Sequence, residues 1–89
     1  MRAIVTVVGQ DRVGIIADVC SLLAKNQVNV LDISQTVMQD YFTMIMTVDV
    51  AGAALPFAEL VKLLEEEGAA KGLTIRAQRE DIFDAMHRI

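Results

Sequence analysis

The chain has 89 residues, enough for one domain but near the lower limit for a protein that folds without disulfides or bound metals. Its net charge is −4 at pH 7 and it has no cluster of lysine or arginine, so it lacks the basic surface that binds a phosphate backbone, and we expect no nucleic-acid partner. The hydrophobic fraction of 54% is high for so short a chain, which favours burial against a partner's surface.

Cys20 is the only cysteine, which excludes an intrachain disulfide and a metal site built on a cysteine pair. We interpret it as a small buried apolar residue in a protein of a reducing compartment. The first residues alternate as a strand does, and no apolar run approaches the length of a membrane span. We therefore expect a cytoplasmic protein with no membrane contact, no metal and no cofactor.

The first predicted element is a strand over residues 2–7, because Ala3, Val5 and Val7 alternate with the residues between them. The next stretch, from Val8 to Ile16, breaks the strand pattern at two glycines before a helix begins. Glycine allows positive φ and close approach, and the first N–H groups of a helix point back into the preceding loop. Those amides favour an anion, so a small molecule with a carboxylate group is a candidate ligand of this loop.

The helix after the loop has an apolar face made of Ile16, Val19, Cys20 and Leu23. Ile15 and Leu22 fall outside this arc, about two turns apart and close to a polar stripe. Apolar residues at positions where solvent is expected suggest a contact with a second copy of the chain.

A hairpin is predicted next, over residues 28–50. Leu31, Ile33 and Val37 alternate with polar residues, which predicts a strand with one buried face and one polar face. Gln39-Asp40 supplies a turn, and the alternation of apolar residues resumes from residue 42 to residue 50.

Pro56 is suited to the first turn of a second helix, whose apolar face holds Phe57, Leu60, Val61 and Leu64. We expect Gly68 and Gly72 to end this helix. A fourth strand follows, in which Leu73, Ile75 and Ala77 alternate with polar residues.

The order strand, helix, strand, strand, helix, strand predicts an α+β protein, a ferredoxin-like sandwich with both helices on one face of an antiparallel sheet. We expect this domain to span residues 1–80 and an amphipathic helix to span residues 81–89. That helix must cover either the open face of the sheet or a neighbouring protomer. The open face is predicted to carry Ile4, Thr6, Ser34, Thr36, Thr43, Ile45, Thr47, Thr74 and Arg76.

Two patterns carry a resemblance to a known family. The first is Gly9-x-Asp11-x-x-Gly14-Ile15-Ile16, followed after the helix by Asn29-Val30-x-Asp32-Ile33. The second is Asp32-Ile33-Ser34-Gln35-Thr36 with the strand from Tyr41 to Met46. Over nearly its whole length the chain resembles an ACT domain, a small regulatory module attached to many enzymes of amino-acid metabolism. It is most similar to a family of short, stand-alone single ACT domains with a C-terminal tail, related to the regulatory protein of the glycine cleavage system.

The resemblance implies a homodimer that binds an amino acid between the loop before the first helix and the start of the second strand. ACT domains commonly pair side by side, joining their sheets at the edge. The corresponding residues here are Gly9, Gln10, Asp11, Arg12, Val13, Gly14 and Ile15 on one side and Asn29 on the other.

Chemical roles follow for some of these residues. Asp11 can accept from an ammonium group, Asn29 can bond the amine or the carboxylate, and amides near Gly14 and Ile15 can hold the carboxylate. Each also has a purely structural interpretation, which stays open: Asp11 as a cap of loop amides, Arg12 as a surface charge, and Asn29 and Gly14 as turn residues.

An enzyme is not expected, because the single histidine, His87, has no serine or cysteine nucleophile beside it. We interpret the chain as a regulatory domain that binds an amino acid or related metabolite and biases a partner enzyme or regulator. The alternative is a constitutive interaction module with a structural loop, in which the helix from Ile82 to Ile89 is the docking surface.

Overall fold

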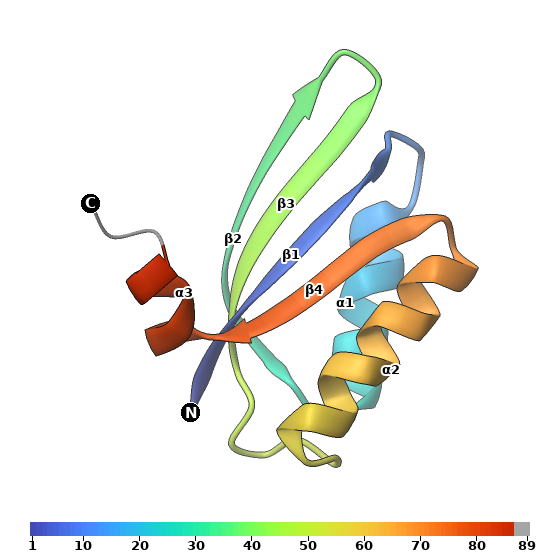
Figure 1. The fold of residues 1–89 in the computed structure, drawn as a ribbon. Helices are drawn as coiled ribbons and strands as arrows, with labels where there is room; N and C mark the ends of the chain where they lie inside the picture. The colour runs from blue at the N-terminus through green and yellow to red at the C-terminus, as the bar shows by residue number, and fades with distance from the viewer. Residues whose placement is uncertain (87–89) are drawn as a thin grey trace.

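The computed structural model describes residues 1–86, which form four strands and three helices. In chain order these are β1 (Arg2–Gln10), α1 (Ile15–Lys25), β2 (Asn29–Met38), β3 (Tyr41–Asp49), α2 (Phe57–Ala70), β4 (Leu73–Arg79) and α3 (Glu80–Met86). The strands form one antiparallel sheet in the order β2-β3-β1-β4, and α1 and α2 lie together on one of its faces (Figure 1). The predicted ferredoxin-like sandwich is confirmed.

The core lies between the sheet and the two long helices. Alternation along β1 and β3 sends Val5, Val7, Met44 and Met46 inward, and each is buried. Leu60 and Leu64 of α2 meet them from the helix layer, as the spacing predicts. Among the described residues, the buried set is entirely apolar, so the fold rests on packing.

β1 is longer than the sequence predicts, because it does not break at Gly9. The strand continues to Gln10, and Gly9 pairs with Phe42 on one side and Leu73 on the other. A Cβ at this position would lie 2.6 Å from Leu73 Cδ2, so a larger residue would displace the Leu73 side chain. Only Gly14 marks the change from strand to helix.

The predicted placement of Ile15 and Ile16 on α1 is wrong. Ile15 is 2% exposed and packs in the core with Val19 and Leu23, whereas Ile16 is 38% exposed. The helix is rotated relative to the predicted arc, because its core stripe follows the i, i+4, i+8 row that begins at Ile15. Leu22 is half-buried against the same core, so Ile15 offers no surface to a second copy and Leu22 offers little.

β2 departs furthest from its prediction of one buried and one polar face. It is an edge strand that α1 contacts but does not bury, and nearly every residue along it is exposed. Val37 illustrates this, because it pairs with buried Phe42 and is itself 51% exposed. The register also shifts between Val30 and Asp32, where a bulge interrupts the alternation.

Gly68 does not end α2, which continues to Ala70; the positive φ of 73° falls at Gly72, after the helix. Gly68 is buried where the helix passes closest to β4, and a Cβ there would lie 2.7 Å from Ile75 Cγ1. The glycine therefore permits the close approach of helix and strand.

α3 lies on the other side of the sheet from α1 and α2, beside the N-terminus and away from the β2–β3 turn (Figure 1). It contacts β1 and β4, and Ile4 beneath that end of the sheet is only 8% exposed although it faces away from the long helices. This agrees with the first of the two predicted positions, packing on the open face. The remainder of the predicted helix, residues 87–89 with His87 and Ile89, lies outside the described residues.

Candidate functional site

The glycine loop joins the end of β1 to the start of α1 at one end of the sheet. The backbone N–H of Asp11 donates to the carbonyl oxygen of Asp40 over 2.8 Å, which ties the loop to the β2–β3 turn. Gly14 then takes a left-handed conformation with φ 91°, and the N–H of Asp18 donates to its carbonyl oxygen to close the first turn of α1. Gly14 stands at the N-cap position, where no side chain bonds the first amides of the helix.

A hollow of about 250 Å³ opens beside this loop, on the helix-covered side of the sheet. The loop and the first turn of α1 form one wall, and β2 and β3 form the other. Its lining residues are Asp11, Arg12, Gly14, Ile15, Ile16, Ala17, Gln35, Val37 and Phe42.

Both signs of charge reach this hollow. The Asp11 side chain is exposed and has no hydrogen-bond or ion-pair partner among residues 1–86. Arg12 is partly engaged, because its Nη1 lies 3.1 Å from Asp18 Oδ2 and also donates to the carbonyl oxygen of Val13. The hollow thus offers a free carboxylate, a guanidinium, an amide side chain and the uncapped amides of α1 beside an apolar wall.

The structure brings together four of the residues expected in the site: Asp11, Arg12, Gly14 and Ile15. Gly9 and Gln10 belong to β1 and do not line the hollow, and Val13 is 98% exposed outside it. Asn29 pairs with Asp49 at the opposite end of β2, about 30 Å from the loop at ~3.3 Å per residue. One chain therefore does not join Asn29 to the loop.

Sequence reasoning missed Ile16, Ala17, Gln35, Val37 and Phe42, which complete the hollow. A signal for Gln35 was present, because it interrupts an alternating face between Ile33 and Val37 with a polar side chain. A polar residue at an otherwise apolar position of a strand indicates either a free edge or a site.

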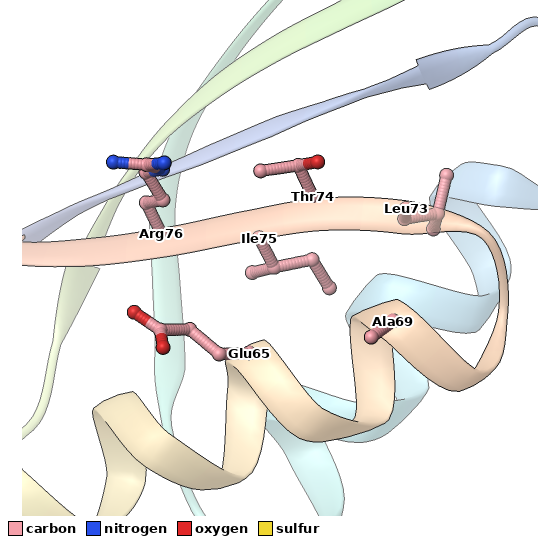
Figure 2. A pocket seen from close by; sticks show the side chains of 6 residues that line it. All are labelled: Glu65, Ala69, Leu73, Thr74, Ile75 and Arg76. Carbon is pink, nitrogen blue, oxygen red and sulfur yellow. The ribbon is translucent and has the colours of Figure 1, made fainter.

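A second hollow, of about 300 Å³, runs along the free edge of β4 beside α2. Figure 2 shows Glu65, Ala69 and Ile75 on the helix side of the strand, while Thr74 and Arg76 point to the other side. Its two charged side chains therefore do not converge, and we assign the candidate site to the loop. No three His, Cys, Asp or Glu side chains within residues 1–86 lie close enough together to hold a metal ion.

The chain is thus a small α+β sandwich whose glycine loop faces a partly polar hollow. A family model described as the ACT domain matches residues 2–78, and the chain belongs to this family. It is 57% identical over 88 residues to a UPF0237 protein of Bifidobacterium longum, covering 99% of this chain and 98% of that protein.

Solved structures agree with this assignment. An ACT domain protein from Streptococcus pneumoniae superposes with a TM-score of 0.83 at 40% identity, and the match covers 98% of both chains. A putative glycine cleavage system transcriptional repressor shares the fold with a TM-score of 0.72 at 23% identity, over 86% of this chain and 44% of that one. The resemblance to a short, single ACT-domain protein is confirmed. Within the described residues, no helix is long and apolar enough to cross a membrane.

Proposed function

We propose that this ACT domain is a non-catalytic regulatory protein that binds a small amino acid or a related metabolite in the hollow beside the glycine loop. The observation that carries the proposal is the free Asp11 carboxylate at the rim of a hollow, on the same wall as the uncapped start of α1. An α-amino acid presents an ammonium and a carboxylate a few ångströms apart, which matches this pair of groups. A purely structural loop would instead use Asp11 as a cap, and α1 has no side-chain cap.

The chemistry of each wall supports a binding mode. The carboxylate of the ligand accepts from the first amides of α1, where the helix dipole also favours negative charge. The ammonium donates to Asp11 and to the amide oxygen of Gln35. Val37 and Ile16 supply exposed apolar surface for the side chain of the ligand.

The proposal includes a homodimer that closes the open side of the hollow. β2 is a free edge, and Ile16, Ile33 and Val37 leave exposed apolar surface on the helix side of this edge. A second β2 paired antiparallel would extend the sheet, satisfy the edge backbone groups and cover these side chains. This contact replaces the one expected from Ile15 and Leu22.

Regulation follows from where the ligand lies. A ligand held between the loop and the edge of the partner's sheet favours the dimer geometry to which it binds more tightly. It can shift the equilibrium between two dimer geometries by no more than the difference between its affinities for them. A partner enzyme or regulator would sense that geometry.

The test is a thermal-shift screen of the purified protein against the standard amino acids at millimolar concentration. A ligand at a hundred times its Kd adds about 2.7 kcal/mol to the free energy of unfolding, which raises the melting temperature of a domain of this size by about 11–22 °C. Asp11→Ala and Gln35→Ala should abolish the shift, whereas Glu67→Ala, an exposed carboxylate on α2, should leave it intact. A shift that survives both site variants, or no shift with any amino acid, would contradict the proposal.

A further inference from the structure

The open face of the sheet carries an exposed patch that α3 leaves uncovered. Its apolar members are Val8 on β1, Ile45 and Tyr41 on β3, and Met38 at the end of β2, and all four are exposed. Strand register places them on neighbouring strands, in the half of the sheet toward the β2–β3 turn. The other residues of this open-face patch are Thr6, Gln10, Ser34, Thr36, Thr43, Thr74 and Arg76.

Charge is nearly absent from the patch. Arg76 is its one charged residue, whereas charged residues make up 22% of the whole chain. Arg76 lies on β4, at the margin, and makes no ion pair within the described part of the chain. Figure 2 shows it beside Thr74, pointing away from α2. Depletion of charge at the centre with a charged residue at the rim is the composition of a protein interface.

We propose that the open-face patch is a self-association surface, on which a second copy of the chain packs face to face. The position of α3 selects the symmetry of that contact. A two-fold axis parallel to the strands would bring both α3 helices to the same end, between the two sheets. An axis that crosses the strands places them at opposite ends, outside the contact, because α3 covers only the end of the sheet near Ile4 (Figure 1).

Side-chain complementarity fits the second axis. When the axis that crosses the strands passes over Val8 and Thr43, which pair directly, Tyr41 of each copy faces Ile45 of the other. The two Arg76 side chains then lie about 13 Å apart along the strands, four residues at ~3.3 Å, so like charges do not meet. Packed sheets keep their strands within about 30° of each other, which this axis allows.

The buried area indicates which assembly forms. The area of the patch is about 320 Å² per copy, because it spans four strands ~4.8 Å apart and five residues of ~3.3 Å along each strand. Two single copies therefore bury about 650 Å² in total, which is below the usual range of specific interfaces. Two side-by-side dimers stacked in this way bury about 1,300 Å², which lies within that range. The inference of a tetramer therefore rests on the dimer of the proposed function. When the two-fold axis of the side-by-side dimer intersects the two-fold axis of the face-to-face contact, the four copies form a closed assembly.

The experiment measures mass by light scattering after gel filtration, for the wild type, Ile45→Lys and a control, Ala58→Lys, on the exposed side of α2. We expect the wild type and the control at about four times the 9.7 kDa of one chain. Ile45→Lys should give half that mass and keep the thermal shift that an amino acid from the screen gives with the wild type, since the hollow lies on the other face. Its tetramer dissociation constant should rise at least about tenfold.

Other outcomes have fixed meanings. If the wild type is a dimer and Ile45→Lys a monomer, the open-face contact stands and the side-by-side dimer fails. A folded Ile45→Lys with the mass of the wild type overturns the inference, and so does a wild type that stays monomeric.

A second measurement needs no variant, because Tyr41 is the only tyrosine and the chain has no tryptophan. Quenching of its fluorescence by acrylamide should fall as protein concentration rises from low micromolar to near millimolar. Quenching that does not change over this range would overturn the inference even if Ile45→Lys fails to fold.

Discussion

Gly68 offers a direct test of how closely α2 packs on β4. Alanine in the interior of a helix is normally more stable than glycine by about 1 kcal/mol, so Gly68→Ala on an isolated helix would stabilise it. Here the new Cβ would lie 2.7 Å and 2.9 Å from Ile75 Cγ1 and Cδ1, and 3.1 Å from the Leu73 carbonyl oxygen. The side chain can move in part, but the carbonyl belongs to the backbone of a paired strand.

The two effects oppose each other, and we expect overpacking to win. Inserting a methyl group into a packed core costs about 1–3 kcal/mol, which exceeds the gain in helix propensity. The net loss is about 1 kcal/mol, which lowers the melting temperature of a domain of this size by about 4–8 °C. Ala58→Gly, at an exposed position in the first turn of the same helix, changes helix propensity without a packing contact and should cost less than about 1 kcal/mol.

Urea unfolding followed by circular dichroism gives the free energies of unfolding, and a double-mutant cycle isolates the contact. Ile75→Ala alone should cost about 2–5 kcal/mol, because it opens a cavity in the core. In the Gly68→Ala background the cost should be smaller by at least about 1 kcal/mol, since the shortened side chain relieves the clash. A Gly68→Ala variant more stable than the wild type, or strictly additive effects, would refute the close packing.

Three further predictions concern the loop, the N-terminus and α3. Gly14→Ala should cost about 1–2 kcal/mol, because Gly14 has φ 91° and the open space around its Cβ leaves backbone strain as the only penalty. Gly52→Ala, at a position with ordinary φ, should change stability little, and urea titrations compare the two variants. The Ala51 N–H donates to the Asp49 carboxylate and, with the N-terminal ammonium nearby, holds the pKa of Asp49 below its ordinary value of 3.8. The contribution of Asp49 to stability is therefore complete above pH 3.8 and is lost as the pH falls through the lower pKa of the folded state. An NMR titration should place the Asp49 midpoint below 3.8, and a midpoint at or above 3.8 would contradict this assignment. Truncation after Glu80 should uncover Ile4 and lower the free energy of unfolding by about 1–2 kcal/mol, and an unchanged melting temperature would show that α3 does not cover it.

Much of the architecture follows from local patterns in the chain. Alternation in residues 3–7, 42–48 and 73–77 assigns the inward and outward faces of three strands correctly, because a side-chain period of two is a property of the strand itself. The apolar row of α2, from Phe57 to Leu64, is likewise visible in its spacing. The candidate site is only half predicted. Asp11, Arg12 and Gly14 follow from the loop, whereas Gln35 and Val37 belong to a strand whose position beside the loop the sequence does not reveal.

The sequence by itself determined the order of elements, the inward faces of the central strands and the loop with its left-handed glycine, since each depends on residues near one another in the chain. Tertiary structure decided the rest. The rotation of α1 that buries Ile15 and exposes Ile16 depends on how the helix sits against β1 and β3. The exposure of β2 follows from its place at the sheet edge, where α1 contacts the strand without burying it. Gly68 lies inside a helix because a strand comes too close for a side chain. These are relations between segments far apart in sequence, which no local period encodes.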